Sequence, residues 1–239
     1  MKTTMKRAAI LGSIAFSLFA LAQPAAAQWQ ATAIGVAEYD TEETLLLLGG
    51  VSAGPGGPGW SPLVGVQSYY LTYKLPTETQ NVFSVRPYAG LRNNFPGGSL
   101  AFTAGYAFVS DDDRVSPVGT AVTDSRDGVV ISGGLDHWGT GGPLGYQLLA
   151  SYNFGGESFW GRGRVTTRVS QLASGGQFRV GGEVAYANSG DFSMTQPGLV
   201  AEWHNGTGLI LGFGVGRKLI ADGDDATFFR LETVIPLAR

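Results

Sequence analysis

The sequence predicts an all-β fold, a single antiparallel up-and-down transmembrane β-barrel of about twelve strands. Three observations predict it. After the first 27 residues, the chain breaks into short segments in which apolar residues alternate with small or polar ones, which is the period of a β-strand. Clusters of Gly, Asn, Asp and Pro separate these segments and suit tight turns. No apolar run of about 18 residues follows the first 27, so helical membrane spans are excluded.

The N-terminal segment has the layout of a secretory signal. Three basic residues precede the uncharged apolar stretch 8–22, and three small residues, 25–27, follow Pro24. This order of regions is typical of a signal peptide, and the apolar stretch is shorter than the roughly 20 residues of a transmembrane helix. We therefore expect residues 1–27 to be removed by cleavage near Ala27, leaving 28–239 as the barrel.

Composition excludes several classes of protein. Without the three basic residues of 1–27, 13 basic residues remain against 19 acidic ones, and this acidic balance argues against nucleic-acid binding. The chain has no cysteine, which excludes disulfides and thiolate metal sites. With 37 glycines and only 15% charged residues, it resembles neither a disordered tail nor a helical bundle. We expect no cofactor.

Alternation assigns the two faces of each expected strand. In 159–169, apolar and small residues occupy the odd positions and arginines occupy most of the even ones. In 63–75, the odd positions, including Leu63 and Leu71, form the largely apolar face that we expect to contact lipid, and the even positions turn polar. The alternation is blurred in the first two segments. The expected strands begin near Trp29, Thr44, Ser61, Gln80, Ser99, Asp127, Pro143, Glu157, Gln177, Phe192, Gly208 and Ala226.

A soluble β-sandwich or binding barrel is the alternative fold, with its apolar face inside. Two features favour the membrane. The polar faces are rich in Gly, Ala, Ser and Thr, which suits a crowded lumen. Aromatic residues also stand at the ends of the apolar faces, as in the girdles of outer-membrane barrels: Tyr73, Phe83, Tyr106, Phe108, Tyr152, Phe159, Tyr186 and Trp203.

Charged residues of the strands are the candidate functional residues. An arginine facing lipid at mid-bilayer costs about 2–4 kcal/mol, so we expect these side chains to point into the lumen. They could form a basic stripe that guides anionic solutes or hydrogen-bonds a sugar chain, or an internal salt-bridge network that plugs a small barrel. The candidates are Arg86, Arg92, Asp136, Arg162, Arg164, Arg168, Arg179, Glu183, Glu202, Lys218, Arg230 and Glu232.

The two histidines are the remaining candidates for chemistry. A lipid hydrolase would need a histidine beside a Ser or Thr nucleophile and an orienting acid. His137 neighbours Asp136, but adjacent residues on a strand point to opposite faces. His204 precedes the turn at 205–206, where a polar residue is expected anyway. We therefore expect no enzyme, with an outer-membrane lipid-modifying hydrolase as the alternative.

The whole of 28–239 resembles bacterial outer-membrane β-barrel proteins. Four stretches, 151–153, 159–164, 181–183 and 212–216, are similar to the barrel proteins associated with bacterial cellulose biosynthesis. That resemblance implies an accessory role in polysaccharide export, with no catalytic residues to carry over.

We thus expect a non-enzymatic outer-membrane barrel, either a narrow channel or a structural accessory for exopolysaccharide export. The alternatives are the hydrolase and a soluble periplasmic binding barrel. The expected partners are outer-membrane lipid, the barrel assembly machinery, and an anionic solute or polysaccharide, but no nucleic acid. If the N-terminus is periplasmic, the longest connection, 110–126, lies on the external side.

Overall fold

A computed structural model gives the structure of the chain. It describes residues 29–74, 79–111, 127–138, 143–172, 175–190, 192–221 and 223–238. Within these ranges, no helix is long and apolar enough to cross a membrane. The predicted signal peptide lies outside the described residues, as does most of the segment 110–126, so both remain predictions.

Twelve strands form one closed sheet in which every strand pairs antiparallel with its sequence neighbours. Each strand has at least 10 residues, enough for the roughly 9–11 residues of a transmembrane strand. The strands are β1 (Trp29–Asp40), β2 (Leu45–Pro55), β3 (Gly59–Lys74), β4 (Thr79–Phe95), β5 (Gly98–Asp111), β6 (Gly128–His137), β7 (Leu144–Asn153), β8 (Ser158–Gln171), β9 (Gln177–Ser189), β10 (Phe192–His204), β11 (Ile210–Ile220) and β12 (Ala226–Ala238).

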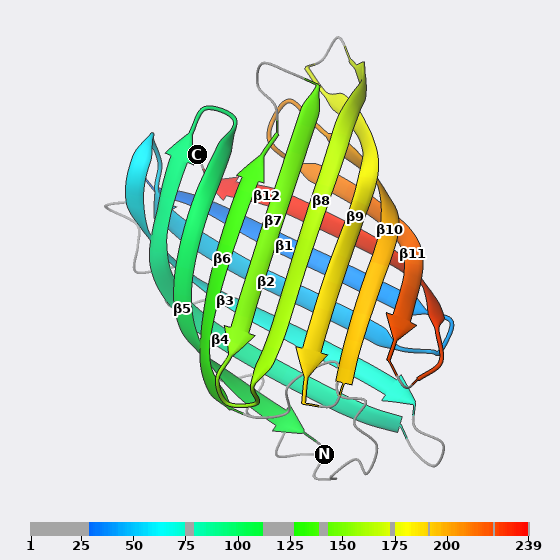
Figure 1. Ribbon diagram of the computed structural model, residues 1–239. Coiled ribbons are helices and arrows are strands. Elements are labelled where there is room, and N and C mark those ends of the chain that lie inside the picture. The colour runs from blue at the N-terminus through cyan, green and yellow to red at the C-terminus, as the bar shows by residue number, and fades with distance from the viewer. Residues whose placement is uncertain are drawn as a thin grey trace.

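The barrel closes where β1 pairs with β12, with Ile34 opposite Val234 and Tyr39 opposite Phe229. In Figure 1 the front strands β7 to β9 cross the direction of β1, β2 and β12 behind them, so the strands are tilted against the barrel axis. The predicted fold class and strand number are confirmed, and each strand begins within two residues of its expected start.

Short turns explain why the strand starts were readable from the sequence. Gly97, between β4 and β5, has a φ of 81°, a conformation that side-chain-bearing residues rarely adopt. We call the rim where β1 begins and β12 ends the terminal rim. The opposite rim, where the segment 112–126 joins β5 to β6, is the loop rim.

The wall of the barrel is apolar outside. Leu199, Leu231, Leu144 and Val165 are 68%, 61%, 59% and 57% exposed, and other large apolar side chains are exposed on nearly every strand. Aromatic rings pair near the rims, as Tyr106 and Phe108 do at 5.0 Å between ring centroids. The inner face instead holds the buried charged side chains of the barrel.

The expected face of β3 is wrong. Leu63 and Leu71 are buried, with exposed fractions of 6% and 1%. Val64, an even-numbered residue on the other face of the strand, is 43% exposed. The odd positions therefore point into the lumen, where Leu71 packs against Val82 in an apolar cluster near the loop rim. Because part of the lumen is itself apolar, both faces of β3 carry large apolar residues and alternation alone misassigned them.

Candidate functional site in the barrel lumen

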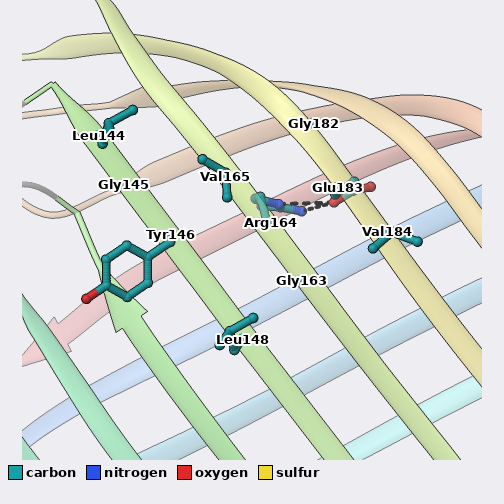
Figure 2. Close-up of a pocket in the computed structure, with 10 residues that line it drawn as sticks. All are labelled: Leu144, Gly145, Tyr146, Leu148, Gly163, Arg164, Val165, Gly182, Glu183 and Val184. Carbon is teal, nitrogen blue, oxygen red and sulfur yellow. Dashed lines mark hydrogen bonds and ion pairs between the residues drawn. The ribbon is translucent and has the colours of Figure 1, made fainter.

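Arg164 of β8 is the centre of the lumen network. Its Nε and Nη2 donate to Glu183 Oε2 at 3.0 and 2.8 Å, and its Nη1 donates to Glu202 Oε1 at 2.7 Å. Its Nη2 also donates to Glu232 at 2.8 and 2.9 Å. Figure 2 shows Arg164 directed toward Glu183, and the exposure of the adjacent Val165 places that side chain on the exterior. One guanidinium thus holds carboxylates from β9, β10 and β12.

Two further arginines share these carboxylates. Arg162 pairs with Glu232 at 2.5 Å and donates to Gln147 Oε1 at 2.6 Å. Arg230 pairs with Glu232 at 2.8 Å through its Nε and also forms an ion pair with Glu183. Since β8 and β12 are not neighbours in the sheet, the pairs between them must span the interior of the barrel.

The network continues toward the loop rim through β1 and β11. Lys218 Nζ lies 2.8 Å from Glu38 Oε1 and 2.7 Å from Asp40 Oδ2. Glu38 also pairs with Arg230 at 3.3 Å and accepts a hydrogen bond from Gln196 at 2.9 Å. These contacts join the ion pairs near the loop rim to those around Arg164.

Sequence reasoning missed Glu38 and Asp40. The alternation of β1 is blurred, and no face was assigned there. A signal was nevertheless present, because residues two apart on a strand share a face and two acidic residues at that spacing are unfavourable in contact with lipid.

Toward the terminal rim, the network ends at His204, and Arg179 forms a separate set of contacts. His204 Nε2 lies 3.0 Å from Glu202 Oε2, and its ring meets Trp138 edge-on at 5.0 Å. Arg179 is fully covered and makes five hydrogen bonds, all to neutral oxygens: Thr166 Oγ1 and O, Gln177 Oε1, Pro143 O and Trp138 O. Because its N–H donors bind the ends of neighbouring strands, Arg179 stabilises the terminal rim and is not available to bind a solute.

Glycines of β11 leave room for the network. Gly212, Gly214 and Gly216 pair with Glu232, Arg230 and Phe228 of β12. A Cβ at Gly214 would lie 3.2 Å from Arg230 Nη2, and one at Gly216 would lie 2.7 Å from the Phe228 ring. The sequence 212–216 therefore supplies space for larger inward side chains of β12.

Arg86, Arg92 and Arg168 lie apart from this network, whereas Asp136 joins it through Gln147, which also accepts a hydrogen bond from Arg162. Arg86 donates to Gln67 and to Ser132 Oγ at 3.4 Å. Asp136 accepts from Gln147 at 2.7 Å and from Ser99 at 3.5 Å. Arg92 has Nε and Nη2 covered without a hydrogen-bond partner in the described ranges. Arg168 is half-buried, and no side-chain ion pair of it is found in the described part of the chain.

The site offers little for catalysis or metal binding. No group of three or more His, Asp or Glu among the described residues could hold a metal ion. His137 lies between the rings of Phe95, at 6.2 Å, and Tyr146, at 5.1 Å. No serine or threonine hydroxyl of the described strands is hydrogen-bonded to either histidine, although Glu202 could orient His204.

The comparisons with known proteins support the fold. Neither a protein-family model nor a curated protein matches the sequence. An outer-membrane channel from Pseudomonas putida F1 matches with a TM-score of 0.55 and 11% identity, over 88% of this chain and 95% of that one.

Two further solved structures align over most of their length with lower scores. KdgM porin has a TM-score of 0.49 and 12% identity, over 85% of this chain and 97% of that one. The translocator domain of the autotransporter NalP from Neisseria meningitidis has a TM-score of 0.44 and 12% identity, over 100% of this chain and 98% of that one. The closed antiparallel barrel of this chain is a fold that it shares with the outer-membrane channel from Pseudomonas putida F1.

Proposed function

We propose that this chain is a non-enzymatic β-barrel of the bacterial outer membrane that acts as a narrow channel. The observation that carries the proposal is the distribution of polarity across the wall. Large apolar side chains are exposed around the exterior, while Arg164, Glu183 and Glu202 are 4%, 8% and 1% exposed in the interior. A soluble barrel would have the opposite arrangement, since soluble proteins rarely expose apolar patches larger than a few hundred Å².

A channel rather than a solid plug is supported by the inner face of β1 to β4. One row of paired positions crosses β1 to β4: Ile34, Gly50, Gln67 and Arg86. Residues that lie opposite one another share a face, so the whole row faces inward, as Arg86 does. Ile34 is 39% exposed in spite of pointing inward. Solvent therefore reaches this part of the lumen.

Polysaccharide export is the second candidate function, and one observation favours it. Trp160 of β8 is opposite Ala187, which belongs to an inner apolar cluster with Met194, so Trp160 also faces inward. It is 37% exposed near the loop rim, where an indole face could stack on a sugar ring. The specific link to cellulose rests on the sequence resemblance alone.

Planar-bilayer recording tests the channel. The protein purified from outer membranes should give steady, small conductance steps in symmetrical KCl. Insertion must be shown independently, by protection of the strands from added protease. A correctly inserted barrel without conductance would contradict the channel and favour the accessory role. Release of fatty acid from lipopolysaccharide that is lost in His204→Ala would instead support the hydrolase.

A further inference from the structure

We infer that Arg86 and Arg92 of β4 form an anion-binding site on the lumen wall that takes a carboxylate. This inference rests on the proposed channel and names the class of solute that it would select. Both residues occupy inward positions of β4, six residues apart, with Tyr88 between them on the same face. The argument depends on how the positive charge of each arginine is balanced.

Neither arginine has a carboxylate partner within the described strands. Arg86 is held by the neutral groups of Gln67 and Ser132. Arg92 has two N–H groups that are covered and unpaired. An arginine removed from water without a compensating charge is costly, and each arginine around Glu232 avoids this cost through ion pairs. A bound anion would provide the missing compensation.

Asp136 of β6, an acidic residue that also faces the lumen, already has hydrogen-bond partners. Asp136 accepts hydrogen bonds from Gln147 and Ser99. All acidic residues outside the described ranges fall, in sequence, in connections between strands that join at the loop rim. Arg92 lies three residues from the end of β4 at the terminal rim, so these connections start at the opposite end of the barrel.

Tyr88, which lies between the two arginines on β4, is turned against the barrel wall. A Cβ at Gly65 would lie 2.5 Å from Cζ and Oη of Tyr88, so the Tyr88 ring lies against the wall over Gly65. The ring is directed toward Ser52 of β2, which lies opposite Gly65. With the Tyr88 ring against β3, the side chains of Arg86 and Arg92 on either side of it are only half-buried, although Nε and Nη2 of Arg92 are covered.

A carboxylate is the anion that fits a guanidinium best, because its two oxygens match two parallel N–H donors. Citrate is a suitable probe because it carries several carboxylates, each of which can pair with one guanidinium. We would titrate citrate into the detergent-solubilised full chain at constant ionic strength and measure binding by calorimetry. Arg86→Gln and Arg92→Gln should each weaken binding about tenfold or more, which is the effect of losing a hydrogen bond to a charged group.

Matched variants separate the site from general charge effects. Arg217→Gln removes the same charge at the exposed loop rim, where the side chain is 57% exposed, and should change citrate affinity less than about twofold. Arg92→Lys keeps the charge without the planar fork and should give an intermediate loss. Neither glutamine variant leaves a carboxylate unpaired, so both should fold, which heat-modifiable gel mobility would verify.

The outcomes distinguish this inference from the channel itself. Binding that is unchanged in the double variant, or absent from the wild type, would overturn the site even where conductance is present. Citrate binding without conductance would contradict the proposed channel and would still support the anion site. Binding that is lost in the double variant and kept in Arg217→Gln would support the site.

Discussion

The lumen has two walls that handle charge in different ways. The paired wall, formed by β8 to β12 and β1, holds a connected set of ion pairs around Arg164 and Lys218. The mixed wall, formed by β2 to β7, holds glycines, small polar residues, an apolar cluster around Leu71, and two arginines without carboxylate partners. The paired wall neutralises most of its charges internally, with Arg168 and Arg179 near the terminal rim as exceptions, whereas neither arginine of β4 has a carboxylate partner in the described ranges.

The inward-facing arginines therefore fall into two groups with different contacts. The arginines of β8 and those of β4 look alike in sequence, since each group occupies one face of an alternating strand. In the structure, Arg162 and Arg164 hold the barrel together across its interior, while Arg86 and Arg92 contact only neutral groups. The internal salt-bridge network is therefore present on one wall, and a basic stripe that guides anionic solutes stays a prediction for the other.

The largest expected effect is on the paired wall. Arg164→Leu removes the shared partner of Glu183, Glu202 and Glu232 and should lower the free energy of unfolding by about 3–5 kcal/mol, because buried carboxylates lose their partner. Urea unfolding of the barrel in lipid vesicles, followed by tryptophan fluorescence, measures the change. A loss below about 1 kcal/mol would mean that the carboxylates find other partners and that the network is not held by Arg164.

The next largest effect tests which surface contacts lipid. Val165 lies in the middle of β8 and is 57% exposed, so Val165→Arg should cost about 2–4 kcal/mol as a charge placed near mid-bilayer. Val165→Thr, at the same position and of similar size, should cost much less. The measurement is assembly yield together with urea unfolding in vesicles. Equal stability of the two variants would contradict a lipid-facing exterior.

A charge on the inner side of the same strand is not the proper control. Thr166 is 1% exposed, and its hydroxyl accepts a hydrogen bond from Arg179. An arginine placed there would remove the hydrogen bond from Arg179 and would have no room. Inward-facing positions on the paired wall are thus as intolerant as the lipid face, for reasons of packing rather than of solvation.

A smaller effect is expected on the mixed wall. In Gly65→Ala, the new methyl group would collide with the Tyr88 ring and with the Val51 carbonyl, 2.6 Å away, and should cost about 1–3 kcal/mol as an overpacked site. Gly182→Ala is the matched control, because the nearest atom to its Cβ is 3.7 Å away. Urea unfolding compares them. Equal stability would show that Tyr88 does not lie over Gly65.

How much of this was readable from sequence differs between the walls. On β8 and β9 the inner and outer rows differ sharply in polarity, so the faces of Arg164 and Val184 followed from alternation. On β3 they did not, because Leu71 packs inside the lumen against a residue of the next strand. Alternation reports the contrast between two faces, and it fails where the lumen is itself apolar.

The pairing of the charges could not be read from sequence. Glu38 and Lys218 are 180 positions apart and lie on strands that do not pair with each other. Their contact depends on closure of the barrel between β1 and β12 and on the space left by the glycines of β11. The set of inward charges follows from the strand period, but their partners follow from the curvature and register of the whole sheet.

The smallest expected effect lies at the loop rim, outside both walls. Arg217 and Asp225 form an ion pair at 3.6 Å with side chains that are 57% and 46% exposed. Such a pair contributes between about 0 and 1 kcal/mol, because water screens it and both side chains lose freedom. Arg217→Gln should therefore leave urea unfolding almost unchanged, and raising the salt concentration should remove any remaining difference from the wild type. A loss comparable to that of Arg164→Leu would mean that burial does not distinguish the structural arginines of this barrel from the others.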